Sequence, residues 1–348
     1  MKYAVTSSFG NDSIALIQYM HENHKGEFFV LYNDTQWASK EWPKRVADLS
    51  MKCFEMGIQV IITQSEGMEN LVRRKKGWPM PASNMQWCTQ ELKERPSLEE
   101  YQKHDETVVR LTVDSVSEDV PALADHMFPF NSKTNAKNKD GTFKHKTELE
   151  VVSGGDLIVV TGRRREESQN RRDLGKWQFN SAKHGGRDVY NPIVMFDEHD
   201  RDIYIRRFGV EPELGIESKF NIEPLPHSSK ECEICVCFNK EEMSKLPLNA
   251  PVIDKIEAIE ISMGHTKNSK PRTMFRPYRC GGAVGIRQVV YGWGHGKRGW
   301  KADHVPNEYK QTGEQCEIFE SASDIAYDEN TKEGREFARQ CEGGYCGS

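Results

Sequence analysis

The feature that most constrains this chain is a regular alternation of short apolar segments with helix-like segments in its N-terminal half. Five apolar segments have the length and composition of buried strands, at residues 3–6, 28–32, 59–63, 108–113 and 157–161. Residues 12–24 carry apolar side chains at helical spacing, and residues 38–56 form a second helix candidate. The alternation predicts an α/β fold with a parallel five-stranded sheet and helices on both of its faces.

The chain has 348 residues, which is long enough for a main domain and an appendage. Residues 115–155 interrupt the alternation, and the polar stretch 131–146 within them predicts an insertion. From about residue 225 the composition changes, first to clustered cysteines and then to interleaved glycine, aromatic and basic residues. We therefore expect one domain over residues 1–225, with its insertion, and a Cys-rich region over residues 226–348.

Composition argues against a membrane protein. Charged residues make up 29% of the chain, the mean hydropathy is −0.73, and no stretch of about 18 apolar residues is present. The N-terminus lacks the charged and apolar regions of a signal peptide. We therefore expect a cytoplasmic protein with no membrane partner.

Charge is distributed unevenly along the chain, although the net charge of −5 by itself requires no nucleic-acid partner. Residues 270–301 carry eight Lys or Arg and no acidic residue, whereas residues 303–348 carry eleven Asp or Glu and four Lys or Arg. This arrangement fits a polyanion partner, or masking of the basic segment by the acidic tail. Two solvated surfaces explain it equally well.

Residues Ser7 to Ser13, between the first predicted strand and the first predicted helix, have the composition of an anion-binding loop. Small hydroxyl residues and Gly10 allow a tight turn that points backbone N–H groups outward, and the helix adds its positive N-terminal end. Ser8 and Ser13 can donate hydroxyl hydrogen bonds, and Asp12 can cap the helix or hold a metal with the phosphates. A plain strand–helix turn with a capped helix is the alternative. The loop lacks the lysine of the GxxxxGK(S/T) phosphate loop.

Polar residues also follow other predicted strands, at the carboxyl ends where parallel sheets bind ligands. Asp34 comes after the second strand and can bond a ribose, an adenine or a metal, or can form an Asx-type turn. Gly162 and Arg164 follow the fifth strand, where glycine lets the backbone approach a ligand and arginine offers a planar fork for phosphate or sulfate. Glu167 can hold an arginine in place. The alternative is a solvated helix face, which Arg/Glu-rich segments usually form.

Together these segments resemble the phosphoadenosine phosphosulfate (PAPS) reductase and N-type ATP pyrophosphatase families of the adenine nucleotide α-hydrolase superfamily. The first loop resembles their SxGxDS pyrophosphate loop, in which a lysine often stands at the position of Asn11. The further matches follow in the family's order: Asp34-Thr35, then Trp87-Cys88-Thr89 with Leu92-Lys93 and Pro96, then the GxRxxESxxR pattern at Gly162, Arg164, Glu167, Ser168 and Arg171, and finally Asn191-Pro192-Ile193. The resemblance covers roughly residues 3–220.

The resemblance implies an enzyme that binds ATP and Mg²⁺ and cleaves ATP to AMP and pyrophosphate, adenylating an acceptor for sulfur transfer or nucleic-acid modification. The pair Asp12-Ser13 favours this reaction, because reductases of the family usually lose that pair. The implied roles are pyrophosphate binding by Ser7, Ser8, Gly10 and Ser13, positioning of magnesium or nucleotide by Asp12 and Asp34, nucleotide binding by Gly162, Glu167 and Ser168, stabilisation of transferring charge by Arg164 and Arg171, and contact with an anionic substrate group by Lys93.

Two other functions are compatible with the sequence. One is a PAPS (sulfonucleotide) reductase, in which a C-terminal thiol, Cys341 or Cys346, attacks the sulfate sulfur. Only the step from Cys346 to Gly347 matches the reductase motif. The other is a protein that binds or modifies DNA or tRNA on residues 270–301, where basic and aromatic residues mix as they do on single-strand-binding surfaces. Plain structural turns, in which glycine–aromatic loops are also common, are the alternative for this segment. A homo-oligomer is compatible with the sequence, which does not fix the oligomeric state.

The nine cysteines favour metal or thiol chemistry over disulfides, because a chain without a secretory signal is expected in a reducing compartment. Clustered thiolates bind zinc or a 4Fe-4S iron–sulfur cluster. We predict such a site at Cys232, Cys235 and Cys237, with a fourth position open among Cys280, Cys88 and His227. Unpaired free cysteines are the alternative.

Overall fold

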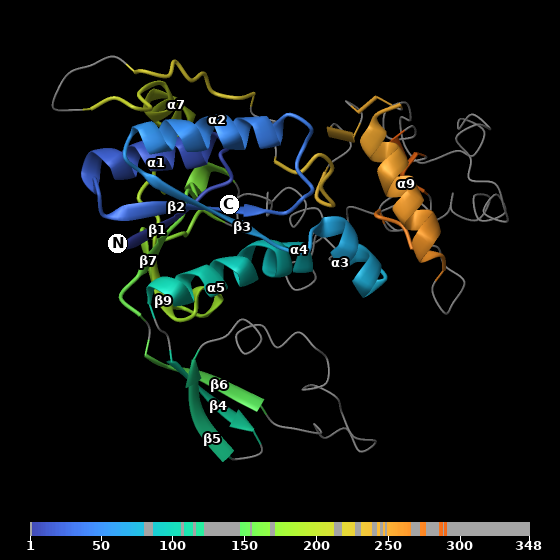
Figure 1. Ribbon diagram of the computed structural model, residues 1–348, viewed down its shortest axis with the longest axis horizontal. Helices are drawn as coiled ribbons and strands as arrows, with labels where there is room; N and C mark the ends of the chain where they lie inside the picture. Colours follow the sequence, from blue (N-terminus) through green and yellow to red (C-terminus); the bar gives the residue numbers. More distant parts are fainter. Residues whose placement is uncertain are drawn as a thin grey trace. The chain divides into compact units, whose positions relative to one another are not determined.

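Figure 1 shows the computed structural model of the chain. The structure describes residues 2–79, 86–105, 108–113, 116–121, 147–153, 155–167, 171–211, 218–226, 231–238, 242–243, 246–247, 249–265, 272–275, 285–287 and 289–290. The chain divides into two compact units. The first contains Met1–Ser65 and Cys88–Glu231, and the second contains Glu66–Trp87 and Cys232–Cys346.

The first unit is built on a six-stranded sheet in which five strands are parallel, so the predicted α/β fold is confirmed. The strand order is β3 (Gln59–Gln64), β2 (Phe28–Asp34), β1 (Tyr3–Thr6), β7 (Ile158–Val160), β9 (Arg187–Tyr190) and β8 (Trp177–Ser181). Only the edge strand β8 runs antiparallel, against β9. At the centre of the sheet Val5 pairs with Val30 on one side and Val160 on the other. The central strands are apolar because both of their faces are covered.

For one of the five strands predicted for this sheet, the prediction is wrong about the sheet to which the strand belongs. Residues 108–113 do form a strand, β4 (Val108–Val113), but it pairs antiparallel with β5 (Val116–Pro121) and β6 (Thr147–Ser153) in a separate three-stranded sheet. Both partners fall inside the predicted insertion, whose polar stretch 131–146 lies outside the described residues. The fifth parallel strand of the main sheet is β9 instead of β4, and β9 pairs with β7.

Helices cover both faces of the main sheet, as predicted. On one face lie α1 (Asn11–Asn23), α2 (Trp42–Glu55) and α7 (Glu198–Arg206), and on the other lies α5 (Arg95–His104), as Figure 1 shows. Neighbouring residues of a strand point to opposite faces. Val5 therefore packs with the α1 side, whereas Ala4 packs with the α5 side.

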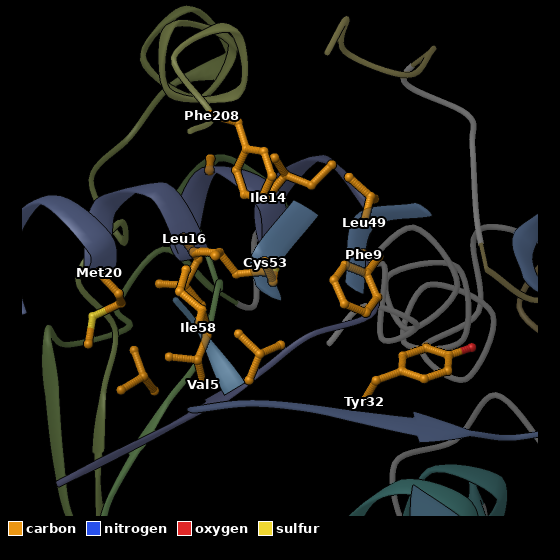
Figure 2. Packing of buried hydrophobic residues seen from close by; sticks show 14 of the residues in the cluster. Val5, Phe9, Ile14, Leu16, Met20, Tyr32, Leu49, Cys53, Ile58 and Phe208 are labelled. Atoms are coloured by element: carbon orange, nitrogen blue, oxygen red, sulfur yellow. The ribbon is translucent and has the colours of Figure 1, made fainter. Parts of the chain in front are cut away.

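The larger core lies between the sheet and the helices α1 and α2, and Figure 2 shows its packing. The fully buried members include Phe9, Ile14, Leu16, Met20 and Phe208. Burying each such side chain contributes roughly 1.5–3 kcal/mol. This core fixes the position of α1 against β1, and thereby the shape of the loop that joins them.

Shorter elements connect the larger ones. A helical segment runs from α4 (Trp87–Thr89) through the π-helical turn η1 (Gln90–Glu94) into α5, and single 3₁₀ turns form η2 (Arg165–Glu167) and η4 (Ala182–His184). The cap of α7 is Asp197, whose side chain accepts from the Asp200 N–H over 2.8 Å.

The second unit contains α3 (Met68–Lys75) and α9 (Pro251–Met263), which lie in contact. Lys255 of α9 lies 3.6 Å from the Glu69 carboxylate of α3, and Arg73 of α3 donates to the Ser262 hydroxyl. Glu260, which is 5% exposed, accepts from the N–H groups of Met274 and Ile286 over 2.8 and 3.0 Å.

Among the described residues, no helix combines the length and the apolar character needed to cross a membrane.

Candidate functional site

The loop between β1 and α1 folds into a tight turn closed by its own serine hydroxyls. The N–H groups of Ser8, Phe9 and Gly10 donate to the side-chain oxygens of Ser13, Ser7 and Ser8 over 3.0, 3.0 and 3.4 Å. Phe9 has a positive φ of 56°, an arrangement that costs about 1–2 kcal/mol outside glycine. Full burial of its ring in the α1–α2 core offsets that cost.

The N-terminus of α1 faces the same turn with unused donors. Its N-cap is Gly10, which has no side chain to cap the helix, and the first helical hydrogen bond runs from Ile14 N–H to Gly10 O over 3.0 Å. The N–H groups of Asn11, Asp12 and Ser13 have no acceptor in the described part of the chain. Three unpaired N–H groups and the positive end of the helix dipole favour an anion at this point.

Two side chains of α2 hold the loop from behind, and sequence analysis missed both. Trp42 donates from Nε1 to Ser8 O over 3.0 Å, and Arg45 donates from Nε to Phe9 O over 2.8 Å. A signal was available, because Arg45 lies on the face of α2 that carries the buried residues Trp42, Val46 and Leu49. An arginine at helical spacing with buried apolar residues is seldom a plain surface residue.

Arg164 and Asp12 meet across the sheet's carboxyl edge, where the segment after β7 passes the start of α1. Arg164 is 2% exposed, donates from Nε to Asp12 Oδ1 over 2.6 Å, and donates from Nη1 to Glu166 Oε2 over 2.9 Å. Its Nη2 has no acceptor within the described ranges. A Cβ on Gly162 would lie 3.3 Å from Asp12 O, so glycine permits this close passage. Asp12 is therefore a partner of Arg164 and not the cap of α1.

The rest of the Arg/Glu-rich segment forms a second ion pair. Arg171 pairs with Glu167 four residues earlier, and their side chains are 14% and 20% exposed. We expected that Glu167 could hold an arginine in place, and the arginine that it pairs with is Arg171. Ser168 lies outside the described residues.

Asp34, at the end of β2, forms the Asx-type turn that sequence analysis gave as the alternative. Its Oδ1 accepts from the Gln36 N–H over 2.8 Å, and Gln36 has a φ of 52°. Next to it, Asn33 accepts from the Thr63 hydroxyl over 2.6 Å and donates to Ser97 over 2.9 Å. One Asp34 oxygen stays without a partner among the described residues and remains open to a ligand.

Lys93, in the π-helical turn η1, is held by a carboxylate that sequence analysis did not single out. Its Nζ donates to Glu231 Oε2 over 2.9 Å, and the Tyr32 hydroxyl donates to Glu231 Oε1 over 3.1 Å. Glu231 is 8% exposed. Burial raises the pKa of the Cys88 thiol, and the nearby Lys93 only partly opposes that shift. Cys88 is therefore a protonated thiol at neutral pH, which is a poor nucleophile.

Asn11, which stands where the resembled families often have a lysine, is occupied with a structural contact. Its Nδ2 donates to Leu225 O and its Oδ1 accepts from Leu225 N–H, both over 2.8 Å. These two hydrogen bonds fasten segment 218–226 to the first turn of α1. Both polar atoms of the Asn11 side chain are therefore bonded to protein backbone.

The predicted metal ligands are only partly within the described residues. Cys232, Cys235 and Cys237 lie in the second unit, where Cys237 N–H donates to Cys235 Sγ over 3.4 Å and Gln86 Nε2 donates to Cys237 Sγ over 3.7 Å. No group of three metal-binding side chains occurs in the described ranges. Cys280, His227, Cys341 and Cys346, and most of the basic segment 270–301, lie outside them.

Comparison with known proteins supports the resemblance seen in the motifs. The family model of the phosphoadenosine phosphosulfate reductase domain matches residues 2–213, which is more than half of the chain. The match includes the β1–α1 loop and the segment from Gly162 to Arg171, and it ends before the cysteine cluster. No curated protein matches the chain.

Proposed function

Because this chain belongs to the phosphoadenosine phosphosulfate reductase domain family, and is thus a nucleotide-utilising enzyme at the level of that family, we propose that it adenylates an acceptor with ATP. An acceptor oxygen attacks the α-phosphorus and forms the new O–P bond. The bond between the α-phosphorus and its bridging oxygen breaks, and pyrophosphate leaves with the electron pair. A nucleophile then displaces AMP from the adenylated acceptor.

The observation that carries the proposal is the concentration of backbone donors at the β1–α1 loop. Ser8, Phe9 and Gly10 direct three successive N–H groups to serine hydroxyls, and α1 adds three more N–H groups without acceptors in the described residues. A pyrophosphate oxygen accepts more strongly than a hydroxyl, because hydrogen bonds to charged groups contribute about 1.5–3 kcal/mol each. Pyrophosphate would therefore displace the serine oxygens, which are then free to donate to it.

Arg164 and Asp12 supply charge beside this loop. The Asp12 side chain is 32% exposed, and its second oxygen has no partner in the described part of the chain. This fits a carboxylate that shares Mg²⁺ with phosphate oxygens, where the ion would neutralise charge on the departing pyrophosphate. Arg164 fixes the Asp12 carboxylate and keeps Nη2 for charge that develops at the α-phosphate.

Product analysis tests the proposal. Purified full-length protein is incubated with ATP and Mg²⁺, and in parallel with PAPS and a thioredoxin system. AMP and pyrophosphate from ATP support adenylation, whereas ADP and phosphate would contradict it. Sulfite from PAPS would replace adenylation by reduction, with Cys346 and Cys341 as the residues to mutate. Calorimetric binding of αβ-methylene ATP needs no acceptor, and its absence would contradict the nucleotide site itself.

Asp12→Asn separates the charge of Asp12 from its structural contact. Asparagine keeps an oxygen that accepts from Arg164 Nε, but it loses the negative charge that we propose binds magnesium. We expect turnover to fall at least about 100-fold with little change in melting temperature, since positioned charges commonly contribute a few kcal/mol to catalysis. Asp48→Asn, on the exposed side of α2 where Asp48 pairs with Lys44, is the matched control. Full turnover in Asp12→Asn would discard this role.

Two further proposals concern segments that lie only partly within the described ranges. A DNA or tRNA acceptor on the basic segment 270–301 predicts a salt-dependent gel shift with single-stranded nucleic acid, and no shift at low salt would contradict it. A zinc or iron–sulfur site at Cys232, Cys235, Cys237 and Cys280 predicts about one metal centre per chain by elemental analysis. Loss of metal in Cys235→Ser, but not in Cys53→Ser, would support that site.

A further inference from the structure

Two side chains of α2 bind successive peptide groups of the β1–α1 loop. Trp42 and Arg45, both on α2, donate to the carbonyl oxygens of Ser8 and Phe9 over 3.0 and 2.8 Å. Neither residue belongs to the motif that identifies the loop in the sequence. Since the two acceptors are adjacent carbonyls of one turn, α2 fixes two adjacent peptide planes.

Fixing a carbonyl also fixes the direction of the N–H group in the same peptide. A trans peptide is planar, and its C=O and N–H point in opposite directions. The carbonyls of Ser8 and Phe9 point to α2, so the N–H groups of Phe9 and Gly10 point away from it. Phe9 has a φ of 56°, and the two amides donate to the hydroxyls of Ser7 and Ser8. A left-handed residue in a tight turn is a feature of the N–H arrangements that bind anions.

Arg45 also brings a charge that no carboxylate in the described part of the chain pairs with. Its guanidinium carbon lies 5.8 Å from the Trp42 ring, and its Nη2 is buried without a hydrogen-bond partner. Desolvation lowers the pKa of Arg45. A partly buried cation without a counter-ion is destabilising, and an anion on the opposite side of the loop would offset part of that cost.

We infer that Arg45 is a positioning residue of the anion site and supplies positive charge to the loop from the side of α2. It acts through the Phe9–Gly10 peptide. The guanidinium polarises the Phe9 carbonyl, and the polarised peptide donates a stronger hydrogen bond from Gly10 N–H to a phosphate oxygen. Trp42 orients the preceding peptide without adding charge. The inference rests on the proposed function in taking the anion to be the pyrophosphate part of a nucleotide.

The test measures binding of inorganic pyrophosphate and αβ-methylene ATP to full-length variants by calorimetry. Arg45→Ala should weaken pyrophosphate binding roughly 10- to 100-fold. Arg45→Lys keeps a charge and Arg45→Gln keeps only a donor, so affinity should fall in the order wild type, Lys, Gln, Ala. Trp42→Phe keeps the ring and loses the donor, and should lose less affinity than Arg45→Ala.

Lys44→Gln is the matched control. It removes one charge at the position before Arg45 on α2, where the Lys44 side chain is 74% exposed and pairs with Asp48. The pyrophosphate affinity of this variant should stay within about twofold of wild type. Wild-type affinity in Arg45→Ala would overturn the inference. An equal loss in Lys44→Gln would do the same, because the effect would then be one of general charge. If Arg45→Ala fails to fold, the pyrophosphate affinities of wild type, Arg45→Lys and Arg45→Gln test the inference. Equal affinities would then overturn it.

Hydrogen exchange of the loop amides, residues 7–13, separates this inference from the proposed function. Arg45→Ala should speed exchange of Phe9 and Gly10, and Lys44→Gln should not, whether or not a nucleotide binds. If wild-type protein binds neither probe, the proposed function is overturned, and the exchange result alone then decides the role of Arg45. Unchanged exchange in Arg45→Ala would overturn that role.

Discussion

At the scale of single residues, Asn11 has a structural role at the position where the loops of the resembled families often have a lysine. The Asn11 amide donates to and accepts from the Leu225 backbone over 2.8 Å in each direction. A lysine side chain has donors but no acceptor, so it cannot make both bonds. The position holds segment 218–226 on α1, while Arg45 and Arg164 carry positive charge next to the loop.

Asn11→Lys, which restores the residue common in resembled loops, should therefore destabilise the protein. It leaves the Leu225 N–H without its acceptor, and we expect a loss of about 1–3 kcal/mol in the free energy of unfolding. Limited proteolysis should also cut segment 218–226 faster. Asn23→Lys, at the exposed C-terminal end of the same helix, is the control and should be nearly neutral. Unchanged stability together with tighter ATP binding would contradict the structural role of Asn11.

The sequence indicated those residues of the candidate site that form a continuous motif next to a strand. It did not indicate the residues whose contacts are distant in the chain. Ser7 to Ser13 lie in one loop, and Gly162 and Arg164 reach it because β7 pairs directly with β1. Glu231 was missed because its contacts, Tyr32 and Lys93, are 199 and 138 residues away. Arg45 was missed because an arginine on a helix is usually solvated. Its helical spacing with buried residues marks it as partly buried, but its acceptor, the Phe9 carbonyl, is seen only in the fold.

At the scale of elements, composition predicted which segments are strands better than which strands are neighbours. The segments at 3–6, 28–32, 59–63 and 157–161 correspond to parallel strands of the main sheet. Segment 108–113 is just as apolar, yet its hydrogen bonds go to β5 and β6. The chemical character of a strand reflects its burial, whereas its partners depend on the path of the chain. β8 and β9 were missed because they are short and polar residues interrupt them.

Gly162 lies close to the first turn of α1, and Gly162→Ala should disturb both that turn and the segment after β7. The added Cβ would lie 3.3 Å from the Asp12 carbonyl oxygen, which belongs to the first turn of α1. That turn cannot move without straining the bond between Asp12 and Arg164. We expect a loss of roughly 1–3 kcal/mol in stability, measured by urea unfolding, and weaker αβ-methylene ATP binding. Gly77→Ala, where the added Cβ meets no atom within 4 Å, is the control. Equal stability of the two variants would mean that α1 adjusts without cost.

At the scale of the whole molecule, the two units carry buried groups whose pKa values are shifted in opposite directions. In the first unit, desolvation and the nearby Arg163 lower the pKa of His184 from 6.5 to about 3. In the second unit, burial raises the pKa of Glu260 from 4.5 to about 8, although the N–H groups of Met274 and Ile286 oppose the shift. Between pH 6.5 and 3 the unfolded first unit takes up a proton that the folded one does not, so its stability falls as the pH falls. Between pH 4.5 and 8 the unfolded second unit loses a proton that the folded one keeps, so its stability falls as the pH rises.

We therefore expect the two units to lose stability at opposite ends of the pH range. Hydrogen exchange at equilibrium, followed at pH 5 and at pH 8.5 with correction for the intrinsic rates, should show α9 less protected at the higher pH and β9 less protected at the lower pH. Glu260→Gln cannot ionise, so it should remove the loss of protection in α9 between these two values. Glu66→Gln, a surface carboxylate of the same unit paired with Arg74, should leave the loss in place. Protection of α9 that stays constant with pH in wild-type protein would contradict the raised pKa of Glu260. A parallel change in α9 and β9 would show instead that the two units unfold as one cooperative block.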